Sequence, residues 1–411
     1  MRNQNSKICQ KEADVLIIGA GPAGTTAAIL LAREGLNVIL ADRFNFPREK
    51  ICGDGLIADT FRALSRLGLK EHVLAHALEI DKLRIYAPNG SYVSVNGRFA
   101  SIPRILFDDI LRKSAVEAGA TFISPYTLIE ALEMDGVVHG ARFRHSQDNT
   151  GMEMKAKFTL LATGANPKPL ELFGVCQRKM PGAVAARSYF RCSEQTADKY
   201  QCFYISYDKT ICPGYGWVFP GTGNTFNIGT GYFLDSKKKP PIRDLKKLWY
   251  RFIDLFHIAR EIVCEAKQIS SLKGALLRTA FTGARLNRPG LMVLGEAAGL
   301  TYSFSGEGIG KAMESGIIAS EILLKYFKEK TTDFSGIDVL YRDTLREKMS
   351  ARFQAYKKAQ RWLSLPMLGD LICWRANAGR YVRKQIGGLI EETVDPKTIF
   401  STIGILKALL F

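Results

Sequence analysis

The sequence predicts an α/β fold in which a dinucleotide-binding domain carries an inserted antiparallel sheet and is followed by a helical segment. Three observations lead to this prediction. A glycine-rich turn near the N-terminus stands between an apolar β run and a helical run. The stretch 176–275 is rich in β-branched and aromatic residues, which favour strands. Beyond residue 331, basic side chains interleave with aromatic and aliphatic ones, as they do on helical surfaces.

The first element is a strand, a tight turn, a helix and a second strand. Residues 14–18 form an apolar β run, residues 25–34 have helical character, and residues 37–40 form a second β run. The turn reads Gly19-Ala20-Gly21-Pro22-Ala23-Gly24. Because strand, helix and second strand all surround the glycines, the motif predicts a Rossmann-like βαβ unit.

Each glycine of this turn has a distinct physical role. Gly19 permits the tight turn, Gly21 lets the backbone approach a pyrophosphate, and Gly24 lets the helix pack on the strand. The phosphates would lie at the helix N-terminus, where free N–H groups and the helix dipole favour anions. Asp42, followed by Arg43, ends the second β run, where an acid binds the ribose hydroxyls in such units. The sequence therefore predicts a dinucleotide site here.

The same stretch contains an uncharged run, residues 15–32, that is long enough for a membrane-spanning helix or a signal anchor. The glycines and the proline within 19–24 would break such a helix. We therefore expect no signal peptide, no transmembrane helix and a cytoplasmic protein. Eight scattered cysteines without C-x-x-C spacing agree with a reducing compartment and predict no metal site.

Five later blocks follow the turn in a fixed order. They are Lys50-Ile51-Cys52-Gly53-Asp54-Gly55, Pro103-Arg104-Ile105-Leu106-Phe107-Asp108, Leu160-Leu161-Ala162-Thr163-Gly164-Ala165, Leu291-Met292-Val293-Leu294-Gly295-Glu296-Ala297-Ala298-Gly299 and Ser305-Gly306-Glu307-Gly308-Ile309-Gly310. In this order the blocks resemble the FAD-dependent oxidoreductases of the para-hydroxybenzoate hydroxylase-type fold.

The resemblance implies non-covalently bound FAD. In that family the first turn holds the ADP half of FAD, the Arg of R-x-x-F-D contacts the flavin nucleotide, and the G-D-A-A-G block meets the ribityl–pyrophosphate region. The cofactor-binding residues implied here are Gly19, Ala20, Gly21, Pro22, Ala23, Gly24, Asp42, Arg43, Cys52, Gly53, Arg104, Gly164, Gly295, Glu296, Gly306, Gly308 and Ile309. Two residues depart from the family pattern, since Asp42 stands where Glu is commoner and Glu296 where Asp is usual.

The glycines at 306, 308 and 310 have a physical explanation of their own. They precede a helix that we expect from about Lys311, and they would let the flavin edge come close to bare N–H groups. The positive end of that helix would then stabilise negative charge on a reduced flavin.

One motif narrows the resemblance to the geranylgeranyl reductase family, which reduces isoprenoid double bonds. The segment 213–220 contains Y-x-W-x-F-P, whereas related halogenases carry W-x-W-x-I-P. On a strand, Tyr215, Trp217 and Phe219 point to one face, where they form a wall suited to a long apolar ligand. The same alternation also suits the core of a sheet. The family places Cys-Gly beside the flavin, so Cys52 is the candidate catalytic residue, with gating, proton supply and packing all open.

These assignments divide the chain into three parts. The FAD-binding domain is discontinuous, comprising residues 1–80, 101–175 and 276–330, and the substrate domain comprises 81–100 and 176–275. Residues 331–411 form the helical, basic C-terminal segment. We expect the charged run 237–241 to be a solvated loop.

The net charge of +17 suggests an acidic partner: nucleic acid, an anionic membrane surface or a phosphorylated ligand. Residues 342–384 hold eleven Lys and Arg against three acids, and they include Trp362 and Trp374. Basic residues with interfacial tryptophans are typical of a helix on an anionic bilayer, although a solvated helical face would show the same charge. The apolar tail 399–411 is too short to span a membrane. No nucleic-acid-binding motif accompanies the charge, so nucleic acid is not an expected partner.

The predicted activity is reduction of carbon–carbon double bonds in a polyprenyl chain by an FAD-dependent enzyme. The substrate is the geranylgeranyl group of a diphosphate, lipid or chlorophyll precursor, or the side chain of menaquinone. Two alternatives stay open: a flavin-dependent monooxygenase or halogenase of the same fold, and an electron-transfer flavoprotein-type quinone oxidoreductase. No second glycine turn follows a strand, so the reductant is either NADPH bound transiently or a donor protein such as ferredoxin.

Overall fold

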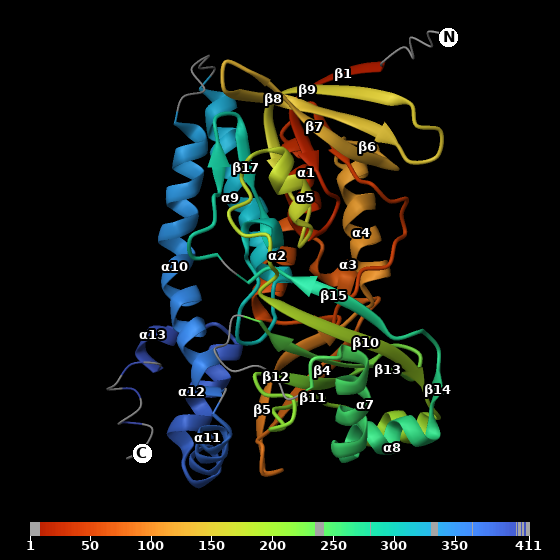
Figure 1. Ribbon diagram of the computed structural model, residues 1–411, viewed down its shortest axis with the longest axis vertical. Coiled ribbons are helices and arrows are strands. Elements are labelled where there is room, and N and C mark those ends of the chain that lie inside the picture. Colours follow the sequence, from red (N-terminus) through yellow and green to blue (C-terminus); the bar gives the residue numbers. More distant parts are fainter. Residues whose placement is uncertain are drawn as a thin grey trace.

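A computed structural model describes residues 9–234, 242–279, 281–329, 336–363, 365–399, 401, 404 and 407. The charged run 237–241 and nearly all of the apolar tail 399–411 lie outside the described residues. The described chain is built on two sheets, one above the other in Figure 1, with the C-terminal helices along one side.

The first sheet has the doubly wound order expected of a dinucleotide-binding fold. Its parallel core runs β17–β9–β1–β2–β6, with β16 antiparallel at one edge and the hairpin β7–β8 attached to β9. The strands are β1 (Cys9–Ile18), β2 (Val38–Ala41), β6 (Thr121–Ile123), β7 (Tyr126–Met134), β8 (Val137–His145), β9 (Gly151–Leu161), β16 (Asn287–Arg288) and β17 (Leu291–Val293).

The N-terminal βαβ unit is present, with bounds wider than predicted. Strand β1 begins at Cys9, and helix α1 (Pro22–Arg33) begins inside the glycine turn because proline suits the first helical position. The inner half of β1 and all of β2 are buried, as a parallel strand covered on both faces requires. Helices α4 (Arg104–Glu117) and α9 (Ile309–Lys328) pack against α1.

The second sheet collects strands from three separate parts of the sequence. Its order is β14–β10–β13–β12–β11–β4–β5–β3, with β15 also paired to β10. All pairs are antiparallel except β11 with β4. The strands are β3 (Gly55–Leu56), β4 (Leu78–Tyr86), β5 (Tyr92–Ser101), β10 (Ala183–Arg191), β11 (Phe203–Ser206), β12 (Gly214–Gly221), β13 (Thr225–Phe233), β14 (Lys267–Gln268) and β15 (Lys273–Leu277). The sheet therefore extends by one to three residues beyond 81–100 and 176–275, and it also includes β3 from the segment 1–80 that was assigned to the FAD-binding domain.

Short helices complete both layers. Helices α7 (Leu245–Leu255) and α8 (His257–Glu265) cover one face of the second sheet, where Trp249 and Phe252 are buried in its core. The remaining short helices are α2 (Ala58–Leu67), α3 (Lys70–Leu74), α5 (Pro167–Leu172), α6 (Glu194–Lys199) and the 3₁₀ turn η1 (Gly295–Ala298).

The C-terminal segment is helical, as predicted, and it bridges the two layers. Helix α10 (Ile337–Leu363) runs along one side of the molecule, past both layers, in Figure 1. Helices α11 (Pro366–Ala378) and α12 (Arg380–Ile390) lie beside β5 and are followed by the short α13 (Pro396–Ile399). Buried Cys373, Ala376 and Val382 pack against Val93 and Val95 of β5. Within the described parts of the chain, every helix is too short or too polar to cross a bilayer.

Candidate active site

A cavity of about 1350 Å³ lies between the two sheets and the C-terminal helices. Most residues predicted from the sequence lie on its wall: Gly19, Gly21, Pro22, Ala23, Asp42, Arg43, Cys52, Gly53, Arg104, Gly164, Tyr215, Trp217, Phe219, Glu296, Gly306, Gly308 and Ile309. Three predicted residues lie behind the wall. Ala20 donates its N–H to Asp42, Gly24 packs on β1, and Gly295 packs on Ala23 and Ala312.

The glycine turn has the shape of a pyrophosphate cradle. A Cβ atom at Gly19 would lie 2.3 Å from the carbonyl oxygen of Ala162, and one at Gly24 would lie 2.0 Å from the carbonyl oxygen of Gly19. A Cβ at Gly21 would meet only the Arg48 guanidinium, at 3.8 Å, so the space in front of Gly21 is open. No side chain caps the start of α1. The turn therefore offers backbone N–H groups and room for a phosphate, which fits FAD.

Asp42 holds the end of β2 to the glycine turn. Its carboxylate accepts hydrogen bonds from the Ala20 N–H at 2.8 Å and from the Phe44 N–H at 2.9 Å. The side chain is buried yet lines the cavity, so its remaining lone pairs face the place where the ribose is expected. Asp42, which is shorter than the usual Glu, thus also holds the glycine turn in place.

Arg104 is fixed by a carboxylate from its own helix. Its Nε and Nη2 donate to Asp108 at 2.6 and 2.9 Å, a bidentate pair that is almost fully buried. Asp108 also pairs with Arg48, at 3.1 Å, and the Nε of Arg48 makes no hydrogen bond among the described residues. Two guanidinium groups therefore line this end of the cavity. They are balanced by two carboxylates, because Asp42 also lies 4.0 Å from the Arg48 Nε, and their N–H groups can donate to an oxygen of a nucleotide.

Glu296 lines the cavity directly after Gly295, which packs on Ala23 of the glycine turn. It is 3.6 Å from the Lys50 Nζ and accepts a hydrogen bond from the Arg278 N–H at 3.3 Å. Gly164 adopts a left-handed conformation beside it, and a Cβ there would lie 3.6 Å from the Glu296 carboxylate. The neighbouring Thr163 hydroxyl is buried without a hydrogen bond within the described chain. An orphaned hydroxyl on the cavity wall also fits a polar cofactor.

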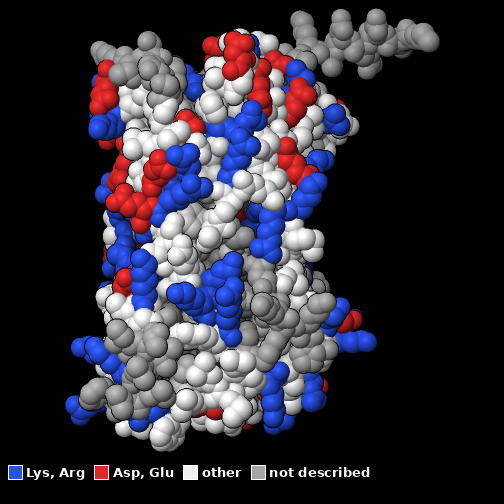
Figure 2. All heavy atoms as spheres, turned by 60° about the vertical axis from the view of Figure 1, so that its left-hand side comes forward, with Lys and Arg blue, Asp and Glu red and all other residues white. Residues whose placement is uncertain are grey.

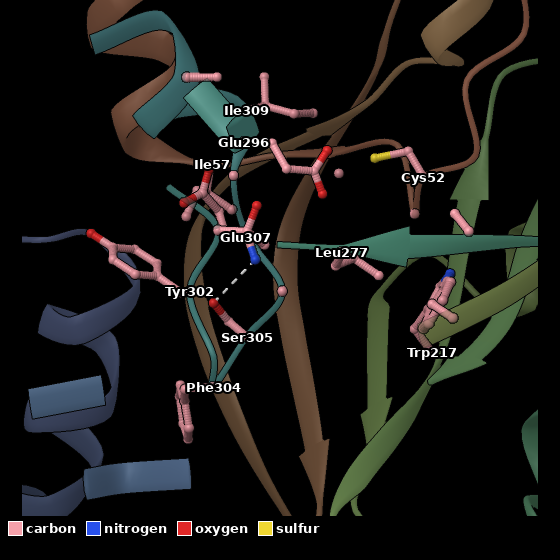
Figure 3. A pocket seen from close by; sticks show the side chains of 18 of the residues that line it. Cys52, Ile57, Trp217, Leu277, Glu296, Tyr302, Phe304, Ser305, Glu307 and Ile309 are labelled. Atoms are coloured by element: carbon pink, nitrogen blue, oxygen red, sulfur yellow. Dashed lines mark hydrogen bonds between the residues drawn. The ribbon is translucent and has the colours of Figure 1, made fainter. Parts of the chain in front are cut away.

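The Cys-Gly pair and the aromatic strand are in direct contact. A Cβ at Gly53 would lie 3.4 Å from both the Trp217 Nε1 and the Phe219 ring, so only glycine lets the loop approach the wall this closely. The pKa of the Cys52 thiol is raised by burial, although the Arg104 guanidinium opposes the shift, so the thiol keeps its proton. Figure 3 shows Cys52 and Glu296 around the same space, with Trp217 and Leu277 on the far side.

A buried polar network fixes this contact. Asn227 donates to the Cys52 carbonyl and to the Asp54 carboxylate, both at 2.8 Å, and accepts from the Trp217 Nε1 at 3.0 Å. The Tyr189 hydroxyl also donates to Asp54. Burial raises the pKa of Asp54 to about 6, although hydrogen bonds from Tyr189 and Asn227 oppose the shift. The network locks the indole and the Cys52 loop together.

The aromatic strand leads into an apolar arm of the cavity. Tyr215 donates its hydroxyl to the Ser305 carbonyl, and Phe219 stacks on Phe203 with ring centroids 4.2 Å apart. Beyond them the wall is aliphatic and aromatic, formed by β4, β5 and β11 on one side and by α11 and α12 on the other. Its residues include Leu83, Ile85, Val93, Phe99, Ile205, Leu368, Leu371, Ile372, Val382, Ile386 and Leu389. Such an arm holds a long hydrocarbon chain.

The sequence did not predict several residues of this site. Asp54 and Glu307 belong to two of the motifs described above, and their positions next to Gly53 and Gly308 could have identified them as site residues. Tyr189 and Asn227 have no such signal, because they meet only through the pairing of β10 with β13. The apolar wall of α11 and α12 also depends on how the C-terminal helices fold back.

Comparisons with known proteins agree with this geometry. A family model described as an FAD binding domain matches residues 12–185. The chain is 29% identical over 326 residues to a menaquinone reductase of Mycobacterium tuberculosis, covering 76% of each protein. It is 26% identical over 318 residues to digeranylgeranylglycerophospholipid reductase 1 of Methanococcoides burtonii, covering 75% of this chain and 74% of the relative.

A geranylgeranyl bacteriochlorophyll reductase-like protein from Thermoplasma acidophilum shares the fold, with a TM-score of 0.76 and 22% identity over 97% of this chain and 96% of that one. The chain is therefore similar to menaquinone and geranylgeranyl-type reductases, and its N-terminal part matches an FAD binding domain. A flavin-dependent brominase has the same fold, with a TM-score of 0.71 and 20% identity over 98% of this chain and all of that one. The fold alone therefore does not distinguish the reductases from the halogenases.

Proposed function

We propose that this protein reduces carbon–carbon double bonds in a polyprenyl chain with bound FAD. The observation that carries the proposal is the continuity of one cavity, which joins the glycine turns of the FAD site to the apolar arm. A prenyl chain lying in that arm would present its double bonds beside Tyr215, Trp217 and Phe219. The curated relatives act, by their names, on menaquinone and on digeranylgeranylglycerophospholipid.

The residues of this chain bind and orient an alkene that has no polar handle. When FAD is bound and reduced, it supplies the hydride for one carbon of the double bond. The aromatic wall holds the bond in place, and the buried network of Asp54 and Asn227 keeps Trp217 from moving. The apolar arm excludes water, so the reducing equivalents are not lost to solvent.

The second carbon needs a proton, and Cys52 is our candidate donor. Its thiol lines the cavity and stays protonated because of burial. Replacing Cys52 with Ala should lower alkene reduction by roughly a hundredfold or more, whereas dithionite should bleach the flavin at an unchanged rate. Cys52→Ser, which keeps a donor, should retain part of the activity. Equal activity in all three proteins would exclude this role.

The test of function is direct. FAD-loaded protein is reduced with dithionite under anaerobic conditions. It is then incubated with geranylgeranyl diphosphate, a digeranylgeranyl lipid or menaquinone, and the masses of the products are measured by mass spectrometry. We expect at least one substrate to gain two hydrogens per reduced bond. If no polyprenyl substrate is saturated and oxygen is instead consumed during hydroxylation or halogenation, the reductase assignment is wrong.

We also propose that the C-terminal helices dock the protein on an anionic membrane, from which the substrate enters. Helix α11 exposes Met367, Leu371 and Trp374 at helical spacing, with 85%, 37% and 60% of each side chain accessible. The same helix lines the apolar arm of the cavity. On the face shown in Figure 2, acidic side chains gather in the upper half, whereas the lower half, where α11 and α12 lie, is mainly basic. An apolar stripe with basic neighbours suits an anionic bilayer.

A further inference from the structure

Two acidic side chains that the proposed reaction does not use meet at Gly310, in the first turn of α9. Glu307 accepts a hydrogen bond from the Gly310 N–H through Oε1, at 3.0 Å. A Cβ at Gly310 would lie 2.1–2.3 Å from the carboxyl atoms of Asp59, so the Asp59 carboxyl rests directly on this glycine. Glu307 Oε2 and Asp59 Oδ2 are both buried, and neither accepts a hydrogen bond from any described residue.

The surrounding charges do not neutralise both acids. Lys311 is buried, and its Nζ contacts Glu314 at 2.8 Å, Glu392 at 2.9 Å and Asp59 at 3.6 Å, so one positive charge serves three carboxylates. Glu307 makes no ion pair among the described residues. The charged and titratable groups facing the pair are Lys311 and Glu314 from α9, Arg62 from α2, Arg352 and Tyr356 from α10, Tyr302 from the preceding loop, Tyr215 from β12 and Glu392 after α12.

The electrostatics of the pair agree with this geometry. Burial and then the nearby Asp59 raise the pKa of Glu307 well above its ordinary value. Burial also raises the pKa of Asp59 to about 6, although Lys311 opposes the shift. Glu392 behaves differently, because Lys311 and Arg352 outweigh its burial and lower its pKa. Two close carboxyls of which one keeps a proton are the usual outcome of such crowding.

We propose that Glu307 and Asp59 share one proton, and that this proton keeps negative charge away from the start of α9 when reduced FAD is bound there. Glu307, Gly308 and Ile309 line the cavity, and Figure 3 shows Glu307 on the loop that leads into Ile309. Reduced FAD carries negative charge that the first amides of α9 stabilise. An ionised Glu307 at the same place would oppose that charge.

The proposal makes the proton balance of flavin reduction depend on Glu307. Reduction of bound FAD to its anionic reduced form takes two electrons from the external reductant and one proton from solvent. When the pair has lost its proton in the oxidised protein, the new negative charge draws one further proton onto the pair. Two protons are then consumed with two electrons, and the midpoint potential falls more steeply with pH.

The test measures the FAD midpoint potential against pH, using xanthine and xanthine oxidase with a redox dye. The wild type should show a steeper fall toward high pH, and Glu307→Gln, which is always neutral, should lose the steeper part. Glu314→Gln is the matched control, because Glu314 also contacts Lys311 but not the shared proton, and it should behave as wild type. Identical profiles for wild type and Glu307→Gln would overturn the proposal.

A second measurement needs no cofactor. At about pH 7.5, above the pKa of about 6 of Asp54 and of Asp59, the FAD-free wild type should show the infrared carbonyl band of a protonated carboxylic acid. Glu307→Gln should lose this band, whereas Glu314→Gln should keep it. A band that persists in Glu307→Gln would overturn the assignment even where that variant binds FAD poorly. The midpoint potential needs only bound FAD, and the infrared band needs only the FAD-free protein, so neither measurement requires an alkene substrate. The reductase function and the shared proton can therefore fail separately.

Discussion

A substitution at Gly21 distinguishes the contribution of the glycine turn to folding from its contribution to FAD binding. Its backbone has φ −83° and ψ −176°, which any residue adopts, and a Cβ there meets little but open space. Gly21→Ala should therefore change the free energy of unfolding of the FAD-free protein by less than about 1 kcal/mol. FAD affinity should fall at least tenfold, about 1.4 kcal/mol, because the methyl group occupies the place of the pyrophosphate. Thermal unfolding and FAD titration check the two effects.

Gly19→Ala provides the contrast for this prediction. Gly19 has φ +107°, and its Cβ would lie 2.3 Å from the Ala162 carbonyl, so the substitution should destabilise the FAD-free protein as well. If Gly21→Ala and Gly19→Ala destabilise the FAD-free protein equally, the open space at Gly21 is not a cofactor site.

Asp54 makes stability depend on pH in a defined direction. Its pKa is raised from 3.8 to about 6 in the folded protein, so between these values the folded state binds more protons than the unfolded state. The contribution of this group to stability is therefore fully present below about pH 4 and lost as pH rises to about 6. The loss is roughly 2–3 kcal/mol.

Asp54→Asn tests this dependence. An amide places an NH2 group, which can only donate, against the donors Tyr189 and Asn227 on one side or the Arg104 N–H on the other, whereas the hydroxyl of a protonated carboxyl can still accept. The variant should therefore be less stable at pH 4. Because the amide does not titrate, its stability deficit should shrink toward pH 7. Denaturant unfolding at several pH values gives the comparison. A deficit that is constant with pH would mean that Asp54 does not titrate in this range.

At the residue scale, the sequence predicted the site residues that belong to local motifs. It missed the site residues that come together only when strands far apart in the sequence pair. The positions of Gly19, Gly21 and Asp42 followed from spacing along one βαβ unit. Tyr189 and Asn227 become neighbours of Asp54 only in the folded sheet. The glycines in the sequence indicated where the backbone comes close to another group, but not which group this is. At Gly53, for example, it is the Trp217 side chain.

Helix α11 is the element on which the membrane proposal depends. Met367→Glu places a charge on the exposed stripe and should weaken binding to vesicles containing phosphatidylserine by tenfold or more, because a charge cannot enter the acyl layer cheaply. Met134→Glu is the matched control, since Met134 on β7 is 64% exposed in the other layer. Vesicle sedimentation distinguishes them, and equal losses would show that the stripe does not touch the bilayer.

Element types followed well from periodicity, and element bounds followed less well. Helix α1 begins at Pro22 rather than at 25, because proline and the small residues of the turn already have helical geometry. Helix α9 begins at Ile309, directly after the Gly308 cap, two residues before the predicted start. The alternating aromatics of β12 were placed correctly because alternation has no helical counterpart.

At the scale of the whole molecule, Glu392 ties the C-terminal helices to the FAD layer. Its buried carboxylate accepts from Lys311 at 2.9 Å, from Arg62 at 2.7 Å and from the Tyr302 hydroxyl at 3.0 Å. Removing one member of such a buried cluster costs about 3–5 kcal/mol. Glu392→Ala should therefore speed hydrogen exchange in α11 and α12 far more than in β1 and β9.

The neighbouring Glu391→Ala is the control for this prediction, because Glu391 is exposed. If both variants leave the exchange of α11 and α12 unchanged, Glu392 does not hold these helices on the cavity. The role of the C-terminal segment as a wall was not predictable from its charge, which described only its outer surface. Its inner surface depends on packing against β5.

The strand order has a consequence for how this chain is made. The chain passes from the first sheet to the second and back twice, and the partners of β9 include both β1 and β17. Helix α1 also packs against α9, which ends only at Lys328. On a ribosome, the first strand therefore emerges long before its layer can close. The first layer is therefore completed only after the last third of the chain, which contains β17 and α9, has been synthesised.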